Sequence, residues 1–124
     1  MTTATAPSPS NLNELATRLT GELHYDAAMR TLYATDASEY QVLPLAVALP
    51  QTEADVRELI LFANANHVGL IPRGAGTSLA GQVVGDGMVV DLGKHLNRIL
   101  SYDDETHRVR VQTGVVRNDL NLYL

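Results

Sequence analysis

Three short apolar segments, separated by one helical stretch and one glycine-rich stretch, constrain the fold more than any other feature of this sequence. They are "PLAVALP" (44–50), "LIP" (70–72) and "MVVDL" (88–92). Short continuous apolar runs are typical of strands that are buried on both faces, as strands of a parallel sheet are. The order strand, helix, strand, loop, strand therefore predicts a parallel β/α unit.

The stretch between the first two apolar segments, "QTEADVRELILFANANHVG", predicts a helix. Thr52 and Asp55 have the spacing of a loose capping box at its start, and Gly69 is suited to end it. The residues that should form its buried stripe recur at helical spacing: Val56, Leu59, Ile60 and Ala63.

An earlier helix is predicted in "SNLNELATRLTGEL", with Ser10 or Asn11 as its cap and Gly21 as its end. The next stretch, 24–44, has no clear period and reads as a short helical or turn region followed by irregular chain. Within it, Asp36 and Ser38 favour local hydrogen bonds from side chain to backbone.

The last part of the chain changes character. "RILSYD" and "RVRVQTG" flank an acidic turn and predict an antiparallel hairpin, and "VVRNDLNLYL" predicts the start of a helix. A lone hairpin is marginal in water, and Leu120, Leu122 and Leu124 have nothing evident to cover them. We therefore expect the chain to be the front part of a longer protein; the alternative is that these leucines pack back on the first half.

Composition excludes several classes of function. The chain has 124 residues, a formal net charge of −5 and no cysteine, which argues against a nucleic-acid surface and excludes disulfides and thiolate metal sites within it. No apolar run is long enough to span a membrane. Residues 1–10, rich in Pro, Ser and Thr, predict a disordered tail and lack the features of a signal peptide.

The stretch "IPRGAGTSLAGQ" (71–82) contains three glycines beside a predicted strand and indicates a close approach of something to the backbone. A Rossmann fingerprint would need a third glycine where Leu79 stands, and too few residues remain for its crossover helix. A nucleotide-triphosphate loop would need lysine where Gln82 stands. The remaining possibilities are an anion nest of backbone amides that holds a dinucleotide diphosphate, or a plain turn between strands.

At this point the sequence resembles a known family. Residues 33–84 closely resemble the FAD-binding, PCMH-type domain of the vanillyl-alcohol-oxidase-like flavoproteins, in particular the branch of D-lactate dehydrogenase and the glycolate oxidase subunit. The matching stretches are 33–38, 44, 47–50, 52–56, 72–81, 90–92, 96–99 and 112–115. The resemblance covers nearly everything after the tail, and its most specific part is the arginine–glycine loop.

The resemblance implies a mixed α+β (α/β) fold in two subdomains with FAD between them. The first, small and parallel, would span about 11–95, and the start of the second, antiparallel, about 96–124. The rest of that domain and the cap that carries the catalytic residues would lie outside this chain. FAD would contact the glycine loop, with these cofactor-binding residues: Pro72, Arg73, Gly74, Ala75, Gly76, Thr77, Ser78 and Gly81.

The loop carries more detailed expectations. Gly74 and Gly76 should adopt backbone dihedrals closed to other residues, with the amides of 74–78 turned toward the diphosphate. Some relatives bond flavin to a histidine in this loop, and Thr77 stands at the nearest equivalent position, so we expect non-covalent FAD. Arg73 either pairs with phosphate or ties the loop to the rest of the domain.

The function that the resemblance implies is a cytoplasmic FAD-dependent oxidoreductase that passes a hydride from a small 2-hydroxy acid, such as D-lactate or glycolate, to the flavin. We expect no catalytic residue, no metal site and no activity in this chain alone. The alternative is a non-catalytic β/α module. The remaining polar candidates are better explained by structure: four histidines without metal-ligand spacing, the acids 103–105 in a turn, and Tyr33 and Tyr40 in packing.

Overall fold

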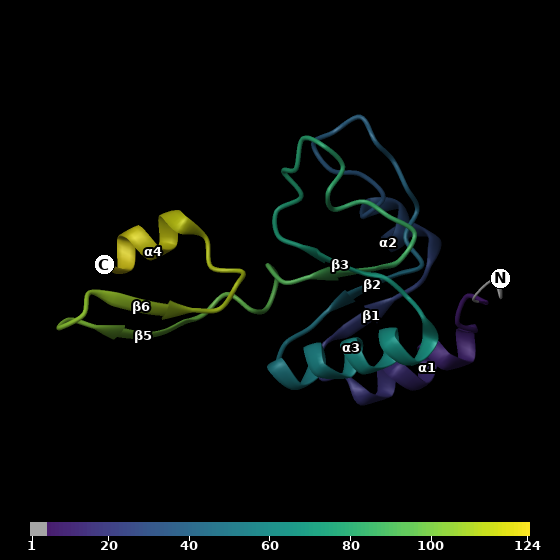
Figure 1. Cartoon of the computed structure of the whole chain (residues 1–124), viewed down its shortest axis with the longest axis horizontal. Helices are drawn as coiled ribbons and strands as arrows, with labels where there is room; N and C mark the ends of the chain where they lie inside the picture. Colours follow the sequence, from purple (N-terminus) through teal and green to yellow (C-terminus); the bar gives the residue numbers. More distant parts are fainter. Residues whose placement is uncertain (1–4) are drawn as a thin grey trace.

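The computed structural model describes residues 5–124, so the predicted disorder of residues 1–4 lies outside the described residues. The elements run in the order α1 (Pro9–Arg18), β1 (Glu22–His24), α2 (Ala27–Leu32), β2 (Ala46–Leu49), α3 (Glu53–Asn66), β3 (Leu70–Arg73), β4 (Met88–Asp91), β5 (Ile99–Asp103), β6 (Arg108–Val111) and α4 (Arg117–Tyr123). They form a four-stranded sheet with helices and a separate two-stranded hairpin followed by α4 (Figure 1).

The three apolar segments are neighbouring strands of one parallel sheet, as predicted. The strand order is β1-β2-β4-β3, so β4 lies between β2 and β3 and pairs in parallel with both. Val89 of β4 lies opposite Val47 on one side and Ile71 on the other. The edge strand β1 pairs antiparallel with β2 and was not predicted. With three residues, it is too short to show an alternating pattern.

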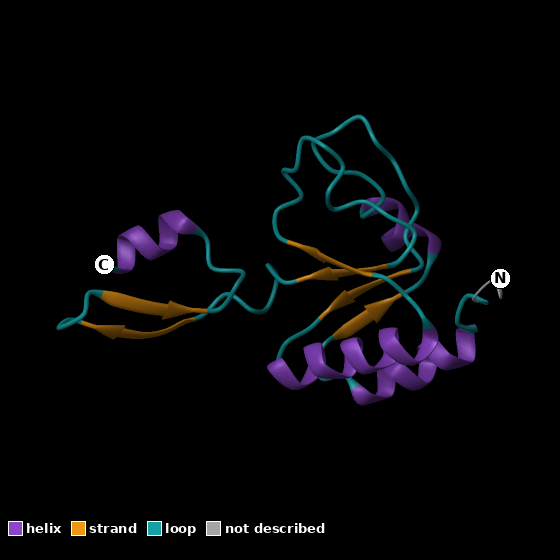
Figure 2. Ribbon diagram, viewed as in Figure 1, coloured by secondary structure: helices purple, strands orange, loops and turns teal. Residues whose placement is uncertain are grey.

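Two helices cover one face of this sheet. Figure 2 shows α1 and α3 side by side beneath the strands, while α2 lies on the other side. Their apolar residues meet the buried side chains of β2 and β4 in a single cluster: Leu12, Leu15, Ala46, Ala48, Leu59, Phe62, Met88 and Val90. This packing makes the sheet a rigid base for the loops that leave its ends.

The first helix begins earlier than predicted. Pro9 is its first residue, and the Ser8 hydroxyl accepts a hydrogen bond from the Asn11 amide, 3.3 Å away, so neither Ser10 nor Asn11 is the cap. Proline suits the first helical position because its fixed φ is already helical and its missing N–H is not needed there. The helix ends at Arg18, before Gly21.

The long helix α3 has the predicted start and a different end. The Thr52 hydroxyl accepts from the Asp55 amide at 3.1 Å, which confirms the cap. The chain leaves the helix at His67, in the left-handed region with φ 53°, rather than at Gly69. In the buried stripe, Ile60 is 53% exposed and Phe62 is 5% exposed, so the predicted place of Ile60 is wrong. Leu59 and Ala63 are buried as predicted, while Asp55 and Phe62 complete the buried side of α3.

A buried carboxylate joins α3 to the loop before β1. Asp55 is 2% exposed, and its oxygens accept hydrogen bonds from the amides of Thr20, Gly21 and Gln51 at 2.8–2.9 Å. Burial opposes ionisation, but these amides outweigh it and hold the pKa of Asp55 below its ordinary value. The ionised carboxylate therefore stabilises the junction of α1, β1 and α3.

We expect Asp55→Ala to lower the free energy of unfolding by about 3 kcal/mol at neutral pH, because it leaves buried amides without acceptors. Since the folded pKa is lowered, this contribution is present above the unfolded pKa near ~4 and is lost as pH falls through the folded value. Denaturant unfolding at several pH values measures it. The exposed Asp86→Ala is the control, and an equal loss in both variants would contradict the prediction.

The hairpin and α4 form the second part of the described chain. β5 and β6 pair antiparallel around the predicted turn, where the Asp103 carboxylate accepts from the amides of Glu105 and Thr106. Figure 1 shows this part to one side of the four-stranded sheet, linked to it by the segment that follows β4. Leu122 and Leu124 are 80% and 66% exposed, so they do not pack back on the first half. Among residues 5–124, no helix is long and apolar enough to cross a membrane.

Candidate cofactor site

The glycine loop leaves the sheet at the carboxyl end of β3, next to the turn that follows β4. Because β3 and β4 are adjacent and parallel, the two connections emerge at the same edge. In open α/β sheets, ligands bind outside the carboxyl ends of the strands. The fold therefore places the predicted loop where a ligand would be expected.

The loop adopts its unusual backbone at two glycines. Gly76 has φ 70° and Gly81 has φ 76°, both in the left-handed region that favours glycine. Among the glycines of residues 5–124, these are the only two in that region, so the expectation is confirmed for Gly76 and wrong for Gly74. Gly74 lies in the bend that directly follows β3, and a Cβ there would meet nothing within 4 Å.

Arg73 fills the space beside Gly76. Its Nη1 donates to the Thr35 carbonyl at 2.8 Å, and its guanidinium carbon lies 5.1 Å from the centre of the Tyr33 ring. A Cβ on Gly76 would lie 2.7 Å from that guanidinium carbon and closer still to Nη2. Of the two roles expected for Arg73, the structure therefore shows the one that ties the loop to residues 33–37. The space beside Gly76 is occupied by this side chain and is not open to a phosphate. A phosphate contact of Arg73 stays a prediction.

The other end of the loop rests on the same neighbouring segment. The Ala37 amide donates to the Gly76 carbonyl at 3.1 Å. A Cβ on Gly81 would lie 2.8 Å from the Tyr40 ring, so glycine is needed there for close packing. The Asp36 carboxylate accepts from the Ser38 amide at 2.8 Å, which is the local turn that these residues predicted. The segment 33–40 thus serves as the support on which the glycine loop lies.

The backbone amides of residues 74–78 remain available to a ligand. Within residues 5–124, we find no hydrogen bond in which one of these five amides is the donor. The Ser78 hydroxyl accepts from the Gln82 amide at 3.2 Å, and Thr77 is exposed. A run of free amides in a glycine-rich turn is the arrangement that binds anions.

The first two residues of this run, Gly74 and Ala75, line a cleft of about 560 Å³. The loop supplies Gly74 and Ala75, the turn after β4 supplies Gly93 and Lys94 beside Asp91, and the chain after β6 supplies 113–116. Of the eight predicted binding residues, the structure brings only Gly74 and Ala75 to this cleft. A hollow of about 590 Å³ between α1 and α3 is lined by helix side chains and by none of the loop residues.

Gly114 fixes the third wall of the cleft against the turn after β4. Its amide donates to the Leu96 carbonyl at 2.8 Å. A Cβ there would lie 2.7 Å from that same carbonyl oxygen, 2.8 Å from the Gly93 Cα and closer still to the Leu92 carbonyl oxygen. The sequence reasoning noted the stretch around Gly114 without assigning it a role. A glycine two or three residues after the end of a strand, as at Gly93 and Gly114, was the signal that could have indicated it.

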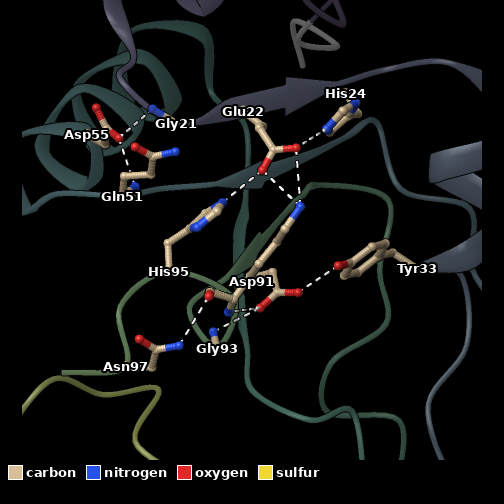
Figure 3. Close-up of polar contacts among 11 residues, drawn as sticks. Gly21, Glu22, His24, Tyr33, Gln51, Asp55, Asp91, Gly93, His95 and Asn97 are labelled. Carbon is tan, nitrogen blue, oxygen red and sulfur yellow. Dashed lines mark hydrogen bonds and ion pairs between the residues drawn. The ribbon is translucent and has the colours of Figure 1, made fainter.

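Lys94 lines the cleft, and its ammonium is paired with the carboxylate of Glu22 on β1. The Lys94 ammonium donates to Glu22 at 3.0 Å, while His95 Nε2 and His24 Nε2 lie 2.8 Å and 3.3 Å from the same carboxylate (Figure 3). The hydrogen bonds from His95 and Lys94 lower the pKa of Glu22 to about 2. This carboxylate therefore stays ionised at neutral pH and anchors the turn that follows β4. Within the described chain, no group of His, Asp and Glu residues has the arrangement of a metal site.

Comparison with known proteins identifies relatives. Residues 44–124 match a family described as FAD binding domain. The chain is 42% identical over 108 residues to D-2-hydroxyglutarate dehydrogenase of Escherichia coli (strain K12), covering 85% of this chain and 11% of that protein. It is 32% identical over 114 residues to glycolate oxidase subunit GlcD of Bacillus subtilis (strain 168), covering 89% of this chain and 24% of that protein.

A solved structure of alkyldihydroxyacetonephosphate synthase superposes with a TM-score of 0.81 over 99% of this chain and 26% of that one, at 19% identity. This likeness confirms the fold class, a parallel β/α part followed by an antiparallel part. The chain spans only a minor share of the length of each of these proteins.

Proposed function

The chain belongs to the FAD binding domain family, and from this premise we propose that it forms the first part of the cofactor site of an oxidoreductase acting on a 2-hydroxy acid. FAD is the cofactor that the family implies. The relatives named above are a D-2-hydroxyglutarate dehydrogenase and a glycolate oxidase subunit, and others are D-lactate dehydrogenases. Their substrates share a carboxylate next to a hydroxyl-bearing carbon, and we propose the same class for the protein that contains this chain.

One observation carries the proposal: the run of free amides at 74–78, which begins at the two loop residues that line the cleft, Gly74 and Ala75. A diphosphate brings two negative charges, and in a chain of net charge −5 it needs local donors. Amides in a glycine-rich turn supply them without side-chain charge, and Lys94 lines the opposite wall. The donor set and the size of the cleft therefore fit the diphosphate part of FAD.

The residues of this chain bind and orient the cofactor. When bound, FAD accepts the hydride that leaves the hydroxyl-bearing carbon of the substrate. We propose that Gly74 to Ser78 hold the diphosphate, that Thr77 adds a hydroxyl donor, and that the backbone of 113–116 closes the cleft on the other side. Pro72, Arg73 and Gly81 then act by fixing the course of the loop.

Reduction of the bound flavin by candidate substrates tests the reaction. The intact protein should lose its oxidised-flavin absorbance when mixed without oxygen with D-2-hydroxyglutarate, D-lactate or glycolate, and the L enantiomers serve as controls. Residues 1–124 alone, tested in parallel with added FAD, should show no flavin reduction with any of these acids. If no 2-hydroxy acid bleaches the intact protein, the oxidoreductase proposal is wrong and a non-catalytic FAD-binding module remains.

We expect the flavin to be held without a covalent bond. Thr77 has no nucleophilic nitrogen or thiol to offer the isoalloxazine ring, and the chain has no cysteine. Acid precipitation of the yellow protein should release all flavin into the supernatant. Yellow colour that stays in the washed pellet would contradict this expectation.

We also propose a cytoplasmic location, with which a cysteine-free composition is compatible. Fractionation of the source cells tests it, and recovery of the protein in another compartment would contradict it.

A further inference from the structure

Tyr33 lies between the two strand-end connections that form the cleft. It follows α2 directly, and its half-buried ring reaches the carboxyl ends of β3 and β4. Its hydroxyl donates to Asp91 Oδ2 at 2.6 Å, as the close-up in Figure 3 shows. Asp91 is the last residue of β4 and lines the cleft.

The second oxygen of the same carboxylate holds the turn after β4. Asp91 Oδ1 accepts from the amides of Gly93 and Lys94 at 2.8 Å and 3.3 Å. Both oxygens of Asp91 are therefore engaged, one by Tyr33 and one by the turn that forms a wall of the cleft. Loss of the Tyr33 hydroxyl would free the carboxylate to rotate and release these amides.

The face of the Tyr33 ring holds the opposite wall. The Arg73 guanidinium lies over it, 5.1 Å from the ring centre, and is fixed there by the Thr35 carbonyl. A guanidinium over an aromatic ring is attracted by the ring quadrupole. Because Arg73 occupies the space beside Gly76, its position sets the path of the glycine loop.

Burial, and after it the hydrogen bond to Asp91, raise the pKa of Tyr33 to about 12. The hydroxyl therefore stays protonated across the neutral range and remains a donor to the carboxylate.

We propose that Tyr33 is a positioning residue of the FAD site: through Asp91 and Arg73 it sets the separation of the glycine loop from the Gly93–Lys94 turn, without touching the cofactor. This inference rests on the proposed function. It goes beyond the packing role expected for Tyr33 from the sequence.

Tyr33→Phe in the intact protein tests it. The variant keeps the ring under Arg73 and removes one charge-assisted hydrogen bond, so we expect the Kd for FAD to rise about tenfold. Tyr102→Phe is the matched control, since it removes a tyrosine–aspartate hydrogen bond, to Asp104 at 3.2 Å, on the exposed hairpin. Its Kd should equal that of the unaltered protein.

Coupling to Asp91 separates positioning from a merely structural role. In a double-mutant cycle, Tyr33→Phe should have little further effect on the Kd once Asp91→Asn is present. All four proteins are titrated with FAD at a temperature well below the midpoint of their thermal unfolding. Loss of folded protein then cannot imitate loss of affinity. Full additivity of the two changes would overturn the inference.

FAD titration of Gly76→Val alongside Tyr33→Phe distinguishes an error about Tyr33 from an error in assigning the cleft as the FAD site. If Gly76→Val loses FAD while Tyr33→Phe binds as tightly as the unaltered protein, Tyr33 is not a positioning residue and the cleft stands. If neither variant binds FAD more weakly, the cleft assignment is wrong and the inference falls with it.

Discussion

Gly76→Val in the intact protein will abolish FAD binding while the four-stranded sheet remains folded. Gly76 has φ 70°, where a β-branched residue is strongly disfavoured. Its new side chain would also enter the space of the Arg73 guanidinium, which is tied to Thr35 and Tyr33. The loop must therefore move, and the amides of 74–78 move with it. The core under α1 and α3 contains no residue of this loop, so the sheet should persist.

The matched control is Gly69→Val, before β3. A Cβ there meets nothing within 4 Å, and Gly69 is not among the left-handed glycines of the described chain. Thr77→Ala should be intermediate, because one neutral hydrogen bond contributes about 0.5–1.5 kcal/mol. Flavin content per protein, with circular dichroism to verify folding, measures all three. Full FAD occupancy in Gly76→Val would show that the loop is only a connection between strands and does not bind the diphosphate.

Gly114→Ala should weaken FAD binding at least tenfold and also destabilise the protein. The added methyl would meet the carbonyl oxygens of Leu92 and Leu96 and the Cα of Gly93. All three are backbone atoms, which cannot turn away as a side chain can, so the segment 113–116 must withdraw from the turn after β4. Overpacking of this kind costs about 1–3 kcal/mol, and the withdrawal opens one wall of the cleft.

Gly85→Ala provides the comparison for that change. There the methyl would meet only the end of the Ile71 side chain, 2.7 Å away at Cδ1, which a change of rotamer relieves. We expect Gly85→Ala to bind FAD normally. FAD titration and thermal unfolding of both variants decide the matter, and equal affinities would show that Gly114 has no part in shaping the cleft.

The parallel strands and α3 could be predicted because their signals are local. Continuous apolar runs marked β2, β3 and β4, and Thr52 with Asp55 marked the start of α3. The strand β1 was not predicted because only its pairing with β2, a contact between distant segments, makes it a strand. The stripe on α3 was misplaced since Ile60 and Phe62 are both apolar, and only the packing of α3 against the rest of the core selects Phe62.

Of the candidate site, only the glycine loop could be predicted from the sequence. Nothing local distinguishes Gly74, which is not among the positive-φ glycines, from Gly76, which has φ 70° and packs against Arg73. The other walls come from Gly93 and from 113–116, well separated in sequence and joined by the fold at one sheet edge. The link from Tyr33 to Asp91 spans three elements and leaves no periodic trace in the sequence.

The central claim is that the diphosphate of FAD binds on the amides of the glycine loop. The most direct test is a crystal structure of the intact protein with FAD, at a resolution that places both phosphorus atoms. We expect phosphate oxygens within about 3 Å of at least two amide nitrogens of residues 74–78, with Gly93, Lys94 and Gly114 facing them across the cleft. A diphosphate bound elsewhere, with those amides hydrogen-bonded only to water or protein, would contradict it.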